Sequence, residues 1–403
     1  MDFNTFCRNL QVAPERMEKL LPLWSEDPAL SVIPEFLTPD FFARYREKLS
    51  LSAEELVIVD RLVQKVCETA QQTPELAIFC NLVFKLLFDE GSTVNGVDFP
   101  EFEALLGDAS GIPALLICLG TMPLVAKKYA SLGIPEEYHE GPLGWIGGTI
   151  RAYQAGSDGR YGQFFSQTFW LRNSMRGELF RIGRFEFQIR PNFAWQLPFF
   201  RNEQNEYLLF ADPAWFVDEA GFRAAEAGDG IWQPTFSDIG GRLEGYPVDP
   251  ATGIVKKEKL CVDAALWKPV LSAHSFCIHL HIPGGGGMTP ELADSSFRQA
   301  IGFFRAYFHR EVEAIFCTSW ILNPDWQRVL PESNLTKLQK KLYLYPGGVD
   351  PLCGLFFVFG RTDTDFASYP ADTSLRRAFH QIWADGGTLR PGSMVLPAAI
   401  YKD

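Results

Sequence analysis

Two histidines, His279 and His281, stand two residues apart in a short apolar run. In an extended strand such residues point to the same face, so the two imidazoles are expected side by side. The ordinary pKa of imidazole lies close to neutral pH, and either ring could therefore act as a general base. Hydrogen-bonded structural histidines and a His-x-His metal site are the alternatives, although no obvious third metal ligand accompanies the pair.

A glycine-rich turn, Pro283–Gly287, follows the histidines directly and leads to a helix start at Thr289-Pro290. Glycines allow close approach of the backbone, and the exposed amides of a helix start favour a phosphate group. The turn matches neither the P-loop pattern nor the dinucleotide-binding pattern with its downstream acid. It is therefore either a binding turn of another kind or a plain flexible connection.

The elements around these residues are expected in the order strand, turn, helix, strand. Apolar runs predict strands over Phe276–Ile282 and Val312–Trp320, and helical periodicity predicts a helix over Pro290–Phe308. A right-handed crossover would place the two strands parallel and adjacent. Short helices are expected near Pro324–Val329 and Ser333–Leu342.

Further strands and turns are expected on both sides of this unit. Alternation over Phe180–Ile189 predicts one half-buried strand, and Tyr207–Phe210 is a second candidate. Residues 211–260 are rich in Gly, Pro and Asp and are expected to form loops. Near the C-terminus, Leu355–Phe359 is expected as a strand and Ser374–Ala384 as a helix.

The first 155 residues are expected to be helical. Helix starts are indicated by Thr38-Pro39-Asp40, by the capping box Ser52–Glu55 and by Thr73-Pro74-Glu75. Two later helices are expected over Pro113–Ala130 and Glu136–Tyr153. The chain is therefore expected to be α+β, with an all-helical domain over 1–155 and a mixed domain with a central sheet over 156–403.

Composition argues against several classes of protein. The net charge of −12 over 403 residues disfavours binding to nucleic acid, whose backbone is also negative. The eight cysteines form no C-x-x-C pair and mostly stand in apolar runs, as free thiols do in a reducing compartment. The start of the sequence does not resemble a signal peptide, and no run of 18 apolar residues predicts a membrane span. A cytoplasmic location, without membrane association, is expected.

Several longer stretches carry a family resemblance. They are His281-Ile282-Pro283 with four glycines and Met-Thr-Pro-Glu, then 296–300, 303–308, 317–324 and 330–335, together with 179–187 and Gly133-Ile134-Pro135 upstream. These stretches resemble a family of bacterial acyltransferase-domain proteins, which have a helical N-acyltransferase N-terminal domain and a GNAT-like C-terminal domain. The resemblance covers most of the chain.

The resemblance implies a reaction and a donor. It implies an acyl-CoA-dependent acyltransferase that takes acetyl-CoA or another acyl-CoA and acylates an amine of a small molecule or peptide, without a metal. In the GNAT fold two parallel strands splay apart and hold the thioester between them. Here those strands would be Phe276–Ile282 and Val312–Trp320.

The resemblance also assigns roles to residues near the expected splay. His281, Ser319 and Tyr343 are the catalytic candidates, and His279, Trp320 and Asn334 are the substrate-binding candidates. Structural alternatives are helix capping by Ser333 or Asn334 and core packing of Trp320 and Tyr343. Cys317 could be a nucleophile, and its alternative is an inert buried thiol. The cofactor-binding candidates are Ile282, Gly284, Gly285, Gly286, Gly287, Ser295 and Ser296.

Two other functions stay open at this point. GNAT enzymes usually begin their pyrophosphate loop with Gln or Arg, and Pro283 occupies that place here. This departure favours a non-catalytic ligand-binding or interaction protein on a GNAT-like scaffold. A metal-dependent enzyme that uses His279 and His281 is the third hypothesis.

Overall fold

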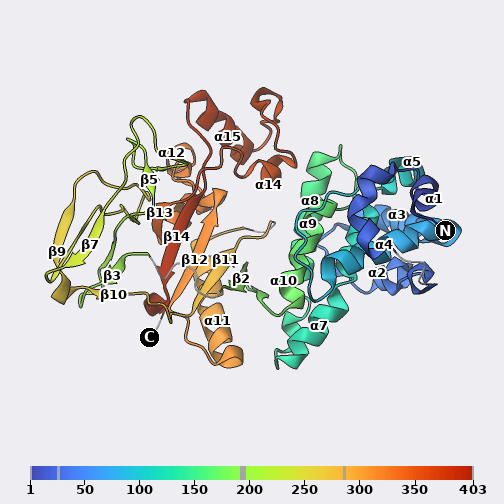
Figure 1. The fold of residues 1–403 in the computed structure, drawn as a ribbon, viewed down its shortest axis with the longest axis horizontal. Helices are drawn as coiled ribbons and strands as arrows, with labels where there is room; N and C mark the ends of the chain where they lie inside the picture. The colour runs from blue at the N-terminus through green and yellow to red at the C-terminus, as the bar shows by residue number, and fades with distance from the viewer. Residues whose placement is uncertain (1, 25–27, 191–196, 285–286, 402–403) are drawn as a thin grey trace. The chain divides into compact units, whose positions relative to one another are not determined.

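The structure is a computed structural model that describes residues 2–24, 28–190, 197–284 and 287–401 (Figure 1). The chain divides into two compact units. The first unit comprises residues 1–181 with the segment 283–285, and the second comprises 182–282 with 286–403. The domain boundary at 155/156 stays a prediction.

The first unit is helical, as expected. Its longest helices begin at predicted signals. Ser52 and Glu55 form both halves of a capping box at the start of α3, and Pro74 is the first residue of α4. Thr38 likewise caps α2. The α-helices are α1 (Phe3–Asn9), α2 (Pro39–Ala43), α3 (Ala53–Gln72), α4 (Pro74–Phe88), α5 (Glu103–Leu106), α6 (Ile112–Leu119), α7 (Met122–Ser131), α8 (Pro142–Gly156), α9 (Phe165–Thr168) and α10 (Arg172–Met175).

The helix α6 lies at the centre of this unit, and all eight of its residues are buried. The single helix expected over Pro113–Ala130 is wrong in detail, because α6 ends at Leu119 and α7 begins at Met122. By length and composition alone, the stretch Ile112–Ser131 is apolar enough to cross a membrane. However, 67% of its apolar window is buried inside the protein, and buried core helices meet the same criterion.

A six-stranded mixed sheet has the order β1-β2-β11-β12-β14-β13; the second unit is built on its strands from β2 onward, whereas most of β1 belongs to the first unit (Figure 1). The α+β prediction is thereby confirmed. β11 runs parallel to β12, and the other pairings with a recorded register are antiparallel. The strands are β1 (Leu179–Ile182), β2 (Phe185–Ile189), β11 (Cys277–His281), β12 (Ala314–Ser319), β13 (Tyr343–Pro346) and β14 (Gly392–Pro397).

The helix α11 (Pro290–Phe308) connects β11 to β12 and covers one face of the sheet. Thr289 caps it, as predicted. Phe297 stacks on Phe185 with 5.5 Å between ring centroids and meets Phe187 edge-on at 6.5 Å. The even-numbered residues of β11 therefore share the α11 face, because Leu280 is paired with Phe187.

The other face of the sheet is covered by the insertion between β2 and β11. Residues of that insertion, among them Leu209, Trp215 and Val248, form one apolar core with Phe316 and Val395 of the sheet. The stretch 211–260, expected to form loops, contains the short strands β5 (Phe216–Val217), β6 (Arg223–Ala224), β7 (Phe236–Ile239) and β8 (Arg242–Gly245). The other strands of the insertion are β3 (Phe199–Arg201), β4 (Tyr207–Leu209), β9 (Leu260–Asp263) and β10 (Lys268–Pro269).

Four short helices complete the unit around a cluster of aromatic rings. They are α12 (Trp326–Val329), α13 (Asn334–Gln339), α14 (Leu355–Phe359) and α15 (Ser374–Ala384). The strand expected over Leu355–Phe359 is wrong. Gly354 and Gly360 bracket it in left-handed conformations, and the short apolar run between them forms one helical turn against the aromatic cluster.

Two other expectations need correction. The single strand expected over Phe180–Ile189 is two strands, because Gly183, at φ 59°, turns the chain between β1 and β2. The helix expected over Glu136–Tyr153 begins instead at Pro142, after a short 3-10 turn over Glu136–Tyr138. Helix α15 and strand β4 lie where they were predicted.

Candidate active site

The two parallel strands of the sheet part before either one ends. The pairing of β11 with β12 runs from Cys277–Ala314 to His279–Phe316. Beyond this point β11 continues against β2 as far as His281, and β12 continues against β14 as far as Ser319. The predicted splay between these strands is therefore present, and its sides are formed by the last residues of β11 and β12.

The position of a residue in the ladder decides which side chains border this split. His281 is paired with Glu186, whereas Thr318 is paired with Ser393. All four point to the face opposite α11, since paired residues share a face and successive residues alternate. One polar row thus crosses the sheet, with His281 on one side of the split and Thr318 on the other.

The two histidines form a hydrogen-bonded chain with residues of β2. His279 Nδ1 lies 3.1 Å from His281 Nε2, and that same nitrogen lies 2.9 Å from Gln188 Oε1. Arg190 Nε donates to Gln188 Oε1 at 3.1 Å. Because guanidinium can only donate, it fixes the amide oxygen toward itself, and the proton shared with His281 then belongs to His281 Nε2.

Burial keeps both imidazoles neutral. It lowers the pKa of His279 to about 4, and the positive charge of Arg190 acts in the same direction. Burial also lowers the pKa of His281 well below its ordinary value, with further contributions from His279 and Arg190. The site therefore holds two uncharged rings at neutral pH.

A chain of hydroxyl groups lies on the other side of the split. Thr318 Oγ1 and Ser393 Oγ are 2.7 Å apart, and the Tyr345 side chain interacts with Ser393 in turn. Burial raises the pKa of Tyr345, so its phenol stays protonated at neutral pH. The sequence analysis did not select Thr318 and Ser393, since 75 residues separate them along the chain.

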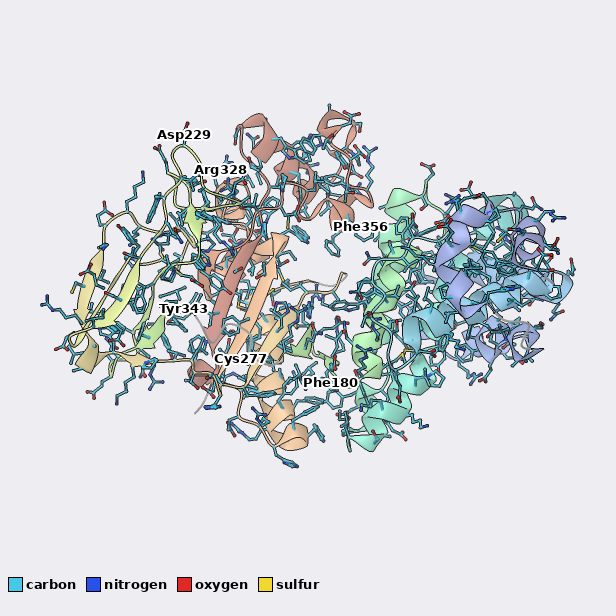
Figure 2. The ribbon with its side chains drawn as sticks, viewed as in Figure 1. Phe180, Asp229, Cys277, Arg328, Tyr343 and Phe356 are labelled. Atoms are coloured by element: carbon cyan, nitrogen blue, oxygen red, sulfur yellow. The ribbon has the colours of Figure 1, made fainter. Side chains whose placement is uncertain are left out.

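Tyr343 lies one row away from the split. This residue, which is labelled in Figure 2, is paired with Val395 in the apolar row that contains Phe316. Its ring lies 5.1 Å from that of Tyr207. Burial raises the pKa of Tyr343, and Tyr207 adds to the shift. The structure therefore brings Tyr345, rather than Tyr343, into the polar row, while a catalytic role for Tyr343 stays a prediction.

The remaining substrate candidates lie at the end of β12 and beyond it. Ser319 points to the α11 face by alternation, and its hydroxyl accepts a hydrogen bond from Ile321 N at 3.3 Å. Trp320 packs in the aromatic cluster, 6.1 Å from the ring of Trp326. Asn334 is exposed at the start of α13, and Ser333 provides the cap there. A catalytic role for Ser319 and substrate binding by Trp320 and Asn334 stay predictions.

The cofactor candidates are only partly described. Gly285 and Gly286 lie outside the described residues, and Ile282, Gly284 and Gly287 lie in the connection between β11 and α11. Arg184, which sequence reasoning missed, donates from Nε to the carbonyl of Gly287 at 3.0 Å. It places a cation beside the glycine-rich turn, where the sequence itself has no basic residue.

The two serine candidates differ in exposure. Ser296 is buried, accepts a hydrogen bond from Arg184 N at 2.7 Å and donates to Leu292 O at 2.9 Å. It therefore holds the β1–β2 turn against α11. Ser295 is exposed and accepts from Gln299 at 2.9 Å. Cofactor binding by either serine stays a prediction.

The structure gives little support to the other chemistries considered. Cys317 is buried, and burial raises the pKa of its thiol to about 12, as expected of an inert cysteine. Within the described ranges, no group of three or more His, Cys, Asp or Glu side chains is placed to hold a metal ion. The His279–His281 pair is accordingly a hydrogen-bonded pair in this structure.

A mixed sheet whose two parallel central strands part in this way, joined by a covering helix, is a GNAT-like domain. Residues 179–396, more than half of the chain, match the family described as GNAT-like C-terminal domain, and the chain belongs to this family. No curated protein sequence matches the chain.

Solved structures of acyltransferases share the fold of the whole chain. One, in complex with decanoyl-CoA and teicoplanin, is 18% identical with a TM-score of 0.61, over 99% of this chain and 100% of that chain. Another, in complex with CoA and 10C-teicoplanin, is 16% identical with a TM-score of 0.60, over 99% and 100%. A third, with decanoyl-CoA, is 18% identical with a TM-score of 0.58, over 98% and 99%. At such identities the likeness establishes the fold.

Proposed function

We propose that the chain transfers an acyl group from an acyl-CoA to an amine of a small-molecule or peptide-like acceptor. The observation that carries this proposal is the end of the β11–β12 pairing at His279 and Phe316, while both strands continue. The family supports it, as do the similar solved structures, which are acyltransferases in complex with acyl-CoAs and with the glycopeptide teicoplanin.

The split provides the place for the thioester. Past His279 and Phe316, the edges of β11 and β12 that face each other are not joined in the ladder. Backbone N–H groups on such edges can donate to a bound pantetheine arm and to the thioester carbonyl, as in the addition of an extended ligand to a strand edge. The glycine-rich turn and Arg184 would hold the pyrophosphate.

His281 is the proposed general base. The amine nitrogen attacks the thioester carbonyl carbon and gives its proton to His281; the new C–N bond forms and the C–S bond breaks. CoA leaves as the thiolate.

The hydroxyl chain Thr318–Ser393–Tyr345 is the proposed path for the proton that the thiolate needs. Thr318 borders the split, and the phenol of Tyr345 at the far end remains protonated at neutral pH. A proton that moves along this chain to the sulfur restores CoA as the thiol, and Tyr345 then regains a proton from solvent, to which His281 releases the proton that it took from the amine. Tyr345 is thus proposed as the acid, and the sequence-based choice of Tyr343 stays a prediction.

The test separates binding from chemistry. Calorimetry with acetyl-CoA and decanoyl-CoA should show saturable binding to the wild-type protein. His281→Gln should bind acetyl-CoA within about twofold of wild type but lose roughly 100-fold or more in turnover, because a general base contributes about that much. His274→Gln is the matched control, since His274 is exposed in the same unit. Absence of acyl-CoA binding at millimolar concentration by folded protein would refute the proposal.

One observation favours the second candidate, a ligand-binding protein without catalysis. The low pKa of His281 makes its imidazole a weak base. In that case acyl-CoA binds, yet no acylated amine forms with any acceptor, and His281→Gln changes neither result. Mass spectrometry of the acceptor after incubation with acyl-CoA distinguishes the two functions.

A further inference from the structure

A cavity of about 200 Å³ opens at one end of the sheet, where the last residues of β11 and β12 split apart. Its wall includes the end of β13 at Pro346, the start of β14 at Gly392, and Leu322 just beyond β12. The insertion over the face opposite α11 contributes Asp218 and the segment 222–225, which includes Arg223 of β6, and the segment before β14 contributes Arg390. Tyr345 is also part of the wall, so the cavity lies beside the polar row that contains Tyr345, Ser393 and Thr318.

Two arginines line this cavity, Arg223 and Arg390. The guanidinium of Arg390 lies 3.9 Å from the ring centroid of Phe222, and that of Arg223 lies 5.5 Å from that of Trp215. Stacking holds a guanidinium in place and leaves the N–H groups at its edge for an anion in the same plane. Trp215 is itself stacked on Tyr345, with centroids 6.1 Å apart.

These arginines carry charge that the described part of the chain does not neutralise. Neither forms an ion pair with a carboxylate among those residues, and Arg223 Nε is buried there without a hydrogen-bond partner. The one acidic side chain of the wall, Asp218, is already engaged: its Oδ1 accepts from Ala220 N and Phe222 N, both at 2.9 Å. In a chain with a net charge of −12, the cavity is thus a positively charged site.

We propose that this cavity is an anion subsite that binds a carboxylate of the acyl acceptor. The proposal rests on the acyltransferase function proposed above and adds the acceptor's second functional group. A planar carboxylate matches two guanidinium edges, which can each donate two parallel hydrogen bonds. The acceptor is then an amino acid-like or peptide-like molecule with its amine at the split and its carboxylate between Arg223 and Arg390.

The spacing of strands sets the length of such an acceptor. Neighbouring strands lie about 4.8 Å apart, so β13 and β12, with β14 between them, are about 10 Å apart. A single amino acid spans at most about 3.6 Å, whereas a tetrapeptide spans up to about 14 Å. The acceptor must therefore separate its amine from its carboxylate by several residues, and free α-amino acids should be poor acceptors.

Calorimetry with tetraglycine, tetraglycine amide and glycine tests this subsite without requiring turnover. Tetraglycine should bind to the wild-type protein at least tenfold more tightly than its amide or than glycine. Arg223→Gln with Arg390→Gln should abolish that preference, and Arg390→Lys alone should weaken it, because lysine keeps the charge but not the planar pair of donors. Arg310→Gln is the matched control, since Arg310 is an exposed arginine that stacks on Phe276 at 4.6 Å.

The outcomes separate the subsite from the transferase. Equal binding of tetraglycine and its amide, or a preference unchanged in the double variant, overturns the subsite. Binding of inorganic phosphate through the two arginines without binding of tetraglycine also overturns it, in favour of a phosphorylated ligand. If the peptide binds as expected but acetyl-CoA does not bind, the subsite stands and the transferase function fails. Thermal unfolding of each variant confirms that it is folded. If the double variant does not fold, the single Arg390→Lys variant still tests the subsite.

Discussion

Acidification from pH 7.5 to pH 4.5 should destabilise the second unit, and His279 should account for much of the loss. Its pKa is about 4 in the folded protein, because burial and Arg190 disfavour the imidazolium, against about 6.5 when exposed. The folded state therefore binds the proton less readily than the unfolded state. The stability that His279 contributes is complete above pH 6.5 and is lost as the pH falls toward 4.

The magnitude follows from these two pKa values. At pH 4.5 the exposed ring is almost fully protonated and the buried ring only in part, which corresponds to about 2.5 kcal/mol from His279 alone at about 1.4 kcal/mol per pKa unit. His281 acts in the same direction. Exposed carboxylates, with pKa values of about 4, also titrate in the lower part of this range, so the difference between wild type and a His279 variant isolates the contribution of His279.

His279→Asn removes the titration and keeps a polar atom near the position of Nδ1, beside His281. Urea unfolding at pH 7.5, 6.5, 5.5 and 4.5 should give a flatter dependence of the unfolding free energy for the variant than for the wild type. The exposed control His274→Asn should follow the wild type. Parallel curves for wild type and His279→Asn would refute the reasoning, as would an NMR titration that places the pKa of His279 near 6.5.

Three further predictions concern contacts that shape the site. Ser296→Ala should lower the free energy of unfolding by about 1–3 kcal/mol, since Arg184 N loses its acceptor, with acetyl-CoA affinity unchanged; a large loss of affinity would instead indicate direct cofactor contact. Gly392→Ala should lower the midpoint of thermal unfolding strongly, because the added Cβ would lie 1.9 Å from Leu322 O; an unchanged midpoint would contradict this close approach. Ser52→Ala should cost about 1 kcal/mol in urea unfolding through loss of the capping box, and no cost would show that the cap is not stabilising.

Sequence reasoning worked where the signal is local. The cap at Thr289, the capping box at Ser52 and the two strands that became β11 and β12 depend on residues a few positions apart. It failed where a short apolar run has no decisive period. Leu355–Phe359 suits a strand as well as a buried helical turn, and only the glycines on each side and the aromatic cluster beneath decide for the helix.

The candidate site was predictable on one side of the split only. His279 and His281 stand two residues apart in the sequence, so their shared face follows from strand geometry alone. The partners of β12 come from distant segments, and their register determines that Thr318, Ser393 and Tyr345 share a row. Tyr343 and Tyr345 share a face, and only the register of β13 against β14 decides which of the two lies in the row of Thr318 and Ser393, so they could not be distinguished beforehand.

The sheet can open between β11 and β12 because each strand keeps a partner on its outer side. Beyond the split, β2 continues to pair with β11 and β14 continues to pair with β12. Between the inner edges the ladder ends at His279 and Phe316. In the proposed function a pantetheine arm lies beyond this point, at the level of the row that holds His281 and Thr318. The end of the pairing at His279 thus links the strand order of the sheet to a binding site, since it opens the edges and sets a base and a hydroxyl on opposite sides of them.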